Sequence, residues 1–230
     1  MTLRYWFSYG WKIYKRNLKK ILAATLVILA CSNLINLVGY LPYGTWLRSI
    51  FHLFLSLPLS AGYIFFCLRL KRNLPAGPKE FLAGFSSVFW RICVTGLLFS
   101  IMTTPFIIPR IPFIVRLFAF LTLAILLGIK YSQSLIIILD KELFPLEALK
   151  FSDKITHGFK LKLFVLYLTM FGMAALFWMS LSMLLSSQRS WGNPIEIFML
   201  IFCLLYIFLF FPWWCIARAA AYDGLRKRYE

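Results

Sequence analysis

Long apolar runs constrain this chain more than any other feature. Six of them approach or exceed the length of about 20 apolar residues that a helix needs to cross the hydrocarbon core of a bilayer. They are residues 21–40, 46–68, 92–108, 112–139, 163–185 and 195–217. The chain is 61% hydrophobic and 14% charged, which is too apolar for a soluble domain. The sequence predicts an all-α, polytopic membrane protein with six transmembrane helices in one integral membrane domain, residues 1–230.

The basic residues predict how these spans are oriented. The chain has 25 Lys and Arg against 8 Asp and Glu. Twenty of the basic residues fall in four segments on one side of the predicted spans: 1–20, 69–91, 141–162 and 218–230. Four fall at the opposite ends: Arg48, Arg110, Arg116 and Arg189. By the positive-inside rule both termini are cytoplasmic, so the charge is a topology signal and no nucleic-acid partner is expected.

A regular spacing of basic residues predicts an internal repeat. Lys20, Arg91 and Lys162 are each the last basic residue before an apolar run, and each is 71 residues from the next. We interpret the chain as three pseudo-repeated units, each an amphipathic surface helix followed by a transmembrane hairpin. The units cover about 1–77, 78–143 and 144–230. The alternative is that hairpins of similar length resemble one another for that reason alone.

The second span of each unit carries a matching position. Pro58 corresponds to Ile129 at a spacing of 71 residues, and Ile129 corresponds to Pro212 at a spacing of 83. A proline within a span removes one backbone hydrogen bond and clashes with the carbonyl four residues earlier. We therefore expect the second and sixth helices to kink.

The first 20 residues predict a helix that lies in the membrane interface. Apolar and small residues recur at helical spacing: Leu3, Trp6, Phe7, Gly10, Ile13 and Tyr14. Basic residues occupy the other positions: Arg4, Lys12, Lys15, Arg16, Lys19 and Lys20. Similar stripes precede the third span, at Phe81, Leu82, Phe85, Val88 and Phe89, and the fifth, at Ala148, Phe151, Ile155 and Phe159. Such helices lie on anionic leaflets, so the six cations are candidates for lipid-headgroup binding.

A second candidate site lies inside the membrane. Lys130 is a charged residue within a predicted span, followed by Gln133, and both are level with Pro58 and Pro212. Broken helices at equivalent positions of repeats are typical of transporter binding sites. The alternative is that Lys130 snorkels to the inner interface and that the prolines serve packing. His52 is the fifth candidate, and a structural role is the alternative for it.

The acidic residues do not form a catalytic pattern. Asp140, Glu142, Glu147 and Asp153 lie among lysines, which predicts salt-bridged helix faces and helix capping. The chain has no nucleophile, nucleotide-binding or zinc-protease motif. Its five cysteines lie within the predicted spans without a CxxC pair, so neither a disulfide framework nor a metal site is predicted. No cofactor is predicted.

Four segments carry a resemblance to a known family. They are residues 131–140 (YSQSLIIILD), 146–152 (LEALKFS), 157–164 (HGFKLKLF) and 218–223 (RAAAYD). They resemble bacterial multi-pass membrane proteins of unknown function that are related to the membrane domain of glycerophosphoryl-diester phosphodiesterases. The resemblance implies a protein of the bacterial cytoplasmic membrane. It implies no hydrolysis, because the catalytic domain of those phosphodiesterases has no counterpart in this chain.

Two functions are consistent with these features. The leading hypothesis is a non-enzymatic scaffold of the bacterial inner membrane whose basic surface helices contact anionic lipids and a membrane protein partner. The alternative is a small transporter or permease component with a site near the broken helices. A water-filled cavity shared by Lys130, Gln133 and the proline breaks would favour transport. The sequence leaves the solute, the partner and the oligomeric state open.

Overall fold

The computed structural model describes residues 2–38, 47, 50–103, 126–186 and 194–229. Every regular element within these ranges is a helix. In chain order they are α1 (Leu3–Arg16), α2 (Leu18–Val38), η1 (His52–Ser56), α4 (Leu57–Lys71), α5 (Pro78–Phe81), η2 (Ala83–Phe85), α6 (Phe89–Thr103), α8 (Ser134–Lys141), α9 (Pro145–Thr156), α10 (Lys160–Ser186), α11 (Pro194–Leu205), η4 (Tyr206–Phe210) and α12 (Phe211–Tyr229). The all-α fold class is therefore confirmed.

Four helical segments are long and apolar enough to cross a membrane. They are Leu18–Ile35, His52–Lys71, Lys160–Leu184 and Pro194–Tyr229, and they match the first, second, fifth and sixth predicted spans. The third predicted span coincides with α6, which is shorter. The first half of the fourth, and the residues Arg48, Arg110, Arg116 and Arg189, lie outside the described residues. The chain is thus a helical protein with several helices suited to a bilayer.

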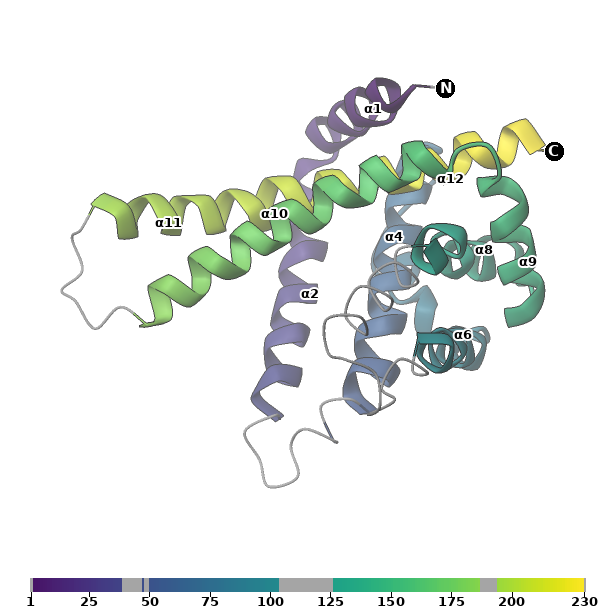
Figure 1. The fold of residues 1–230 in the computed structure, drawn as a ribbon, viewed down its shortest axis with the longest axis horizontal. Coiled ribbons are helices and arrows are strands. Elements are labelled where there is room, and N and C mark those ends of the chain that lie inside the picture. Colours follow the sequence, from purple (N-terminus) through teal and green to yellow (C-terminus); the bar gives the residue numbers. More distant parts are fainter. Residues whose placement is uncertain (1, 39–46, 48–49, 104–125, 187–193, 230) are drawn as a thin grey trace, which may run out of the picture.

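The apolar helices point in two directions (Figure 1). α11, η4 and α12 form one long helix, and α10 packs against its first part. α2 and α4 leave this pair and run downward in the view of Figure 1. The α10–α11 hairpin therefore extends away from the rest of the described molecule.

Both predicted proline kinks coincide with π-helical turns. The five residues before Leu57 form η1, and the five before Phe211 form η4. In each turn a backbone N–H donates to the carbonyl five residues earlier, from Leu57 to His52 and from Phe211 to Tyr206. Because the following proline has no N–H, the helix widens locally at this point.

The best-packed region is the place where α1, α4, α8 and α12 meet. Residues with no or almost no exposed surface there include Trp6, Ile136, Ile137, Ile138, Ala217, Ala219, Ala221 and Tyr222. The alanines of α12 present little side chain, so neighbouring helices approach it closely. This packing brings the ends of α4, α8 and α12 together.

The elements predicted to lie at the interface each pack on another helix. α1 lies along α12, α5 and η2 lie on α4, and α9 lies on α8. On α1 the buried residues are Trp6, Gly10, Ile13 and Tyr14, which confirms the predicted apolar face. On α9 they include Ala148 and Ile155, also as predicted.

The element before the third span differs from the prediction. In place of one amphipathic helix the chain forms the short α5 and the 3₁₀ turn η2. Phe81 and Val88 are buried, but Leu82 and Phe85 are exposed. Gly84 explains the difference, because its backbone lies so close to the carbonyl of Pro58 that a Cβ there would overlap that oxygen. This contact fixes a turn where a regular helix was expected.

Candidate functional site

The six predicted headgroup cations are all exposed. Arg4, Lys12, Lys15 and Arg16 belong to α1, while Lys19 and Lys20 open α2. The opposite face of α1 is buried against α12. α1 therefore presents charge to its surroundings on one side and packs on the protein with the other, as an interfacial helix does.

Aromatic side chains hold α1 in place. Trp213 Nε1 donates to the carbonyl of Phe7 at 2.9 Å, and its ring lies 5.2 Å from that of Phe7. Tyr14 Oη donates to the carbonyl of Phe208 in η4. The π-helical turn leaves this carbonyl available because Pro212, four residues later, has no N–H. The irregular helix thus supplies one anchor for the basic helix.

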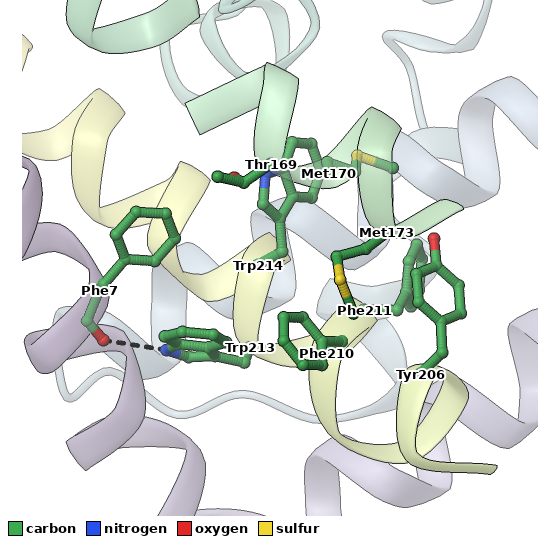
Figure 2. A pocket seen from close by; sticks show the side chains of 9 residues that line it. All are labelled: Phe7, Thr169, Met170, Met173, Tyr206, Phe210, Phe211, Trp213 and Trp214. Carbon is green, nitrogen blue, oxygen red and sulfur yellow. Dashed lines mark hydrogen bonds between the residues drawn. The ribbon is translucent and has the colours of Figure 1, made fainter. Parts of the chain in front are cut away.

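An apolar cavity lies beside these anchors (Figure 2). Its volume is about 250 Å³. It is enclosed by α10, by η4 and the start of α12, and by one residue of α1. The lining residues are Phe7, Thr169, Met170, Met173, Tyr206, Phe210, Phe211, Trp213 and Trp214. Methionine and aromatic side chains suit a flexible hydrocarbon ligand.

The predicted intramembrane candidates have separate surroundings. Lys130 Nζ pairs with Asp153 of α9 at 3.2 Å, and both side chains are more than one third exposed. His52 is exposed and bonds to Ser56 within its own helix. Both contacts agree with the structural alternatives given above for these two residues.

The other three candidates are buried. Pro58 lies against η2, and Pro212 follows η4 close to the apolar cavity. Gln133 is completely buried, and its side chain donates to Ser132. None of the five candidates is among the described residues that line the cavity in Figure 2.

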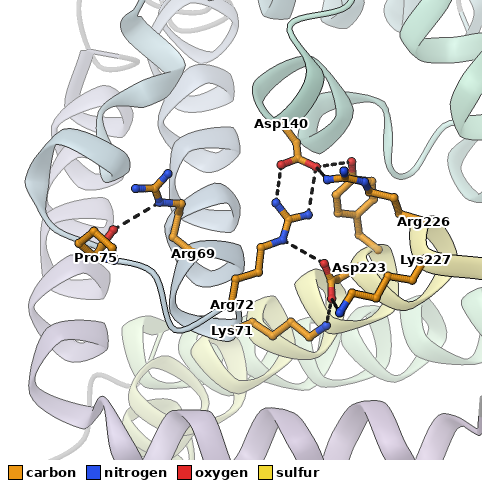
Figure 3. A network of polar contacts seen from close by, with 9 residues as sticks. Arg69, Lys71, Arg72, Pro75, Asp140, Asp223, Arg226 and Lys227 are labelled. Atoms are coloured by element: carbon orange, nitrogen blue, oxygen red, sulfur yellow. Dashed lines mark hydrogen bonds and ion pairs between the residues drawn. The ribbon is translucent and has the colours of Figure 1, made fainter. Parts of the chain in front are cut away.

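A buried ion-pair network joins α4, α8 and α12 (Figure 3). Asp140, near the end of α8, accepts two hydrogen bonds from Arg72, at 2.6 and 3.1 Å. It also accepts one from Tyr222 at 2.8 Å and one from Arg226 at 2.7 Å. The side chain of Asp140 is only 6% exposed, so these bonds replace its contacts with water.

Asp223 forms the second half of this network. It accepts a hydrogen bond from Nε of Arg72 at 2.9 Å and pairs with Lys71, and Lys227 lies 3.6 Å away. Its side chain is 3% exposed. Arg72 therefore bridges the two carboxylates, and four cations surround two anions. The network fastens the ends of three helices from different parts of the chain.

The network lowers the pKa of Asp140. Burial alone would raise that pKa, because it penalises the charged carboxylate. Hydrogen bonds from Arg72 and Tyr222, together with the charges of Arg72 and Arg226, outweigh the burial. Asp140 is consequently ionised at neutral pH and acts as a hydrogen-bond acceptor.

The sequence interpretation did not find this network. It assigned Asp140 to a local salt-bridged helix face or a helix cap, and it used Asp223 only for the family resemblance. A signal was present, because 83 residues separate Asp140 from Asp223, the spacing of Ile129 and Pro212. Arg72 and Arg226 are likewise 154 residues apart, as are Pro58 and Pro212. The repeat pattern thus marks both carboxylates and two of their partners.

These features define a class of protein. It is a helical protein with membrane-length apolar helices, a basic helix packed on its last helix and ion-paired helix ends. No family model, curated protein or solved structure matches the chain.

Proposed function

We propose that this chain is a non-enzymatic scaffold of the bacterial cytoplasmic membrane that gathers anionic phospholipids, and a membrane protein partner, around its basic surface helices. The carrying observation is the α1 region, where all six cations are exposed while the opposite face is buried on α12. Each exposed cation near an anionic leaflet contributes about 1 kcal/mol of attraction.

The proposal includes a topology of six spans in three units, with both termini in the cytoplasm. The matching π-helical turns before Pro58 and Pro212 support the repeat. The contact of each predicted surface element with a helix of another unit supports it further, since α5 and η2 contact α4, α9 contacts α8, and α1 contacts α12. On this view the three units form a closed ring, with α1 completing it.

Transport is the weaker proposal. Transport would require a hydrated site shared by Lys130, Gln133 and the prolines. Lys130 instead pairs with Asp153 on α9, and the cavity near Pro212 is apolar. A packed scaffold with a snorkelling lysine accounts for these contacts without a solute pathway.

Lipid enrichment in proteoliposomes tests the scaffold proposal. Energy transfer from the native tryptophans to dansyl-labelled lipids reports which lipids surround the chain. We expect the wild-type chain to prefer labelled phosphatidylglycerol over labelled phosphatidylcholine, and salt to weaken this preference. A variant with Lys12, Lys15, Arg16 and Lys19 changed to Glu should lose about tenfold or more in preference.

The control is the same variant in vesicles of phosphatidylcholine alone, where its helix content and thermal unfolding should equal those of the wild type. An unchanged preference for phosphatidylglycerol in the charge-reversed variant would refute the proposal.

A further inference from the structure

A second polar cluster lies where the helix is interrupted just before α8. Residues 131–133 form a turn between helical residues 126–130 and α8. Side chains from other helices cover the carbonyls that the break exposes. Ser152 of α9 donates to the carbonyl of Lys130 at 2.9 Å, and Arg218 of α12 donates to that of Ser132. The break is thus an ordered meeting point of three helices.

Three buried polar atoms near this break have no hydrogen-bond partner in the described structure: Gln133 Oε1, Tyr167 Oη and Arg218 Nε. Gln133 has no exposed surface. Arg218 connects the three residues, because it bonds to Ser132, the neighbour of Gln133, and its guanidinium lies 5.6 Å from the ring centre of Tyr167. Buried polar groups are rarely left unpaired, so such a group of them marks a candidate site for a bound polar molecule.

Arg218 has no carboxylate partner among the described residues. Its contacts are the Ser132 carbonyl and the rings of Tyr167 and Trp214. Asp223, the acid nearest to Arg218 in sequence, pairs with Lys71 and Arg72. A cation among aromatic rings, with a buried N–H still free, favours an anion.

The groups at this site suit a phosphate. Arg218 Nε–H and Tyr167 O–H are both donors, and guanidinium groups match phosphate oxygens well. The Gln133 amide bonds to Ser132 Oγ through Nε2. Rotating the amide by half a turn makes Oε1 the acceptor from Ser132, and it turns the NH₂ toward the unpaired position. Arg218, Tyr167 and Gln133 then each offer a donor group to an anion.

Trp214 links this site to the apolar cavity. Its ring lies 5.8 Å from the guanidinium of Arg218, and the same side chain lines the cavity in Figure 2. A polar site for an anion and an apolar cavity therefore meet at one residue. That combination matches an amphiphile with a phosphate at its head.

We propose that Arg218, Tyr167 and Gln133 bind the phosphate of a single phospholipid, with one of its acyl chains in the cavity lined by Trp214. This site is separate from the α1 cations, which attract lipids to the surface. It rests on the proposed function only in that the chain lies in a phospholipid bilayer.

Native mass spectrometry of the delipidated full chain in detergent, titrated with phosphatidylglycerol, tests the proposal. We expect one tightly bound lipid per chain. Arg218→Gln should weaken its binding about tenfold or more, since a hydrogen-bonded charge is lost. Tyr167→Phe should weaken it about tenfold and leave folding intact, because the ring stays and the hydroxyl has no internal partner. Lys79→Gln, at an exposed cation of α5, is the matched control and should bind like the wild type.

The outcomes separate the two proposals and the two sources of phosphate. Equal lipid affinity in the wild type, Arg218→Gln and Tyr167→Phe would overturn the site. Displacement of the lipid by millimolar inorganic phosphate would assign the site to free phosphate and overturn the role of the cavity. The α1 charge-reversed variant should keep its one bound lipid, so loss of surface enrichment leaves this inference standing.

Discussion

The α10–α11 hairpin and the joined ends of α4, α8 and α12 differ in which side chains they expose and which they bury. In the hairpin large apolar side chains are exposed, such as Phe171, Trp178 and Phe198 at 61 to 69%. At the joined ends the carboxylates of Asp140 and Asp223 are almost completely buried. A soluble protein shows the reverse pattern. The hairpin is therefore suited to lipid, whereas buried ion pairs join the ends of α4, α8 and α12 in addition to their apolar contacts.

Asp140→Asn breaks the buried side of this comparison and has the largest expected effect. It removes the carboxylate that accepts hydrogen bonds from Arg72, Tyr222 and Arg226 at a site that is 6% exposed, which costs about 3 to 5 kcal/mol of unfolding free energy. Asp153→Asn is the control, since it removes the half-exposed pair with Lys130 and should cost about 1 kcal/mol or less. Chemical unfolding in detergent measures both. Similar losses in the two variants would mean that the network contributes no more than a surface pair.

Phe171→Lys tests the lipid side. On a surface in water a lysine at this exposed position would cost almost nothing, whereas near the centre of a bilayer it costs about 2.5 to 3.5 kcal/mol. Leu161→Lys, also exposed in α10 but beside Lys160 and Lys162, should have little effect. Insertion of α10 into microsomal membranes, followed by glycosylation, gives the two free energies. Equal insertion of both variants would show that α10 does not cross the membrane.

Gly62→Ala compares helix packing in the two regions. A Cβ at Gly62 would overlap the carbonyl oxygen of Phe81, so α4 and α5 must separate, at about 1 to 3 kcal/mol. At Gly172 in α10 a Cβ meets nothing within 4 Å. Gly172→Ala should therefore be neutral or stabilise by up to about 1 kcal/mol. Thermal unfolding of the two variants measures both changes in stability. A destabilised Gly172→Ala variant would mean that another part of the protein packs against the hairpin at this position.

Lowering the pH is expected to have the smallest effect on stability. The pKa of Asp140 is lower in the folded chain than its ordinary value of 3.8. Its contribution to stability is therefore complete above that value and is lost as the pH falls through the folded pKa. We expect unfolding temperatures to be level between pH 7 and about pH 5 and to decrease below about pH 4. The decrease should be smaller in Asp140→Asn, and identical acid profiles would mean that other carboxylates carry it.

Local patterns account for what the sequence predicted. The apolar runs predicted the four membrane-length helices, and helical periodicity predicted which face of α1 and of α9 is buried. Proline chemistry predicted the two irregular helices, although the widened turns that precede Pro58 and Pro212 were not foreseen. These properties depend on residues within a few turns of one another.

The site residues that were missed depend on distant partners. Asp140 bonds to side chains 68 to 86 residues away, and Arg218 bonds to a carbonyl 86 residues away. Within its own segment Asp140 looks like any acid near lysines. Only the placement of α4, α8 and α12 turns it into a buried acceptor, and the repeat spacing that relates Asp140 to Asp223 does not by itself show that the two carboxylates share one cation.

The packing of α1 on α12 has a consequence for the order in which the chain folds during its synthesis. α1 packs along α12, and Gly10 lies against Ala217, so burial of the α1 face waits until residues about 200 positions later have been made. At about 5 to 20 residues per second the interval is roughly 10 to 40 s. During that interval the apolar face of α1 has only the membrane to cover it. Burial of Trp6 should therefore mark the moment at which α12 has been made and has packed on α1.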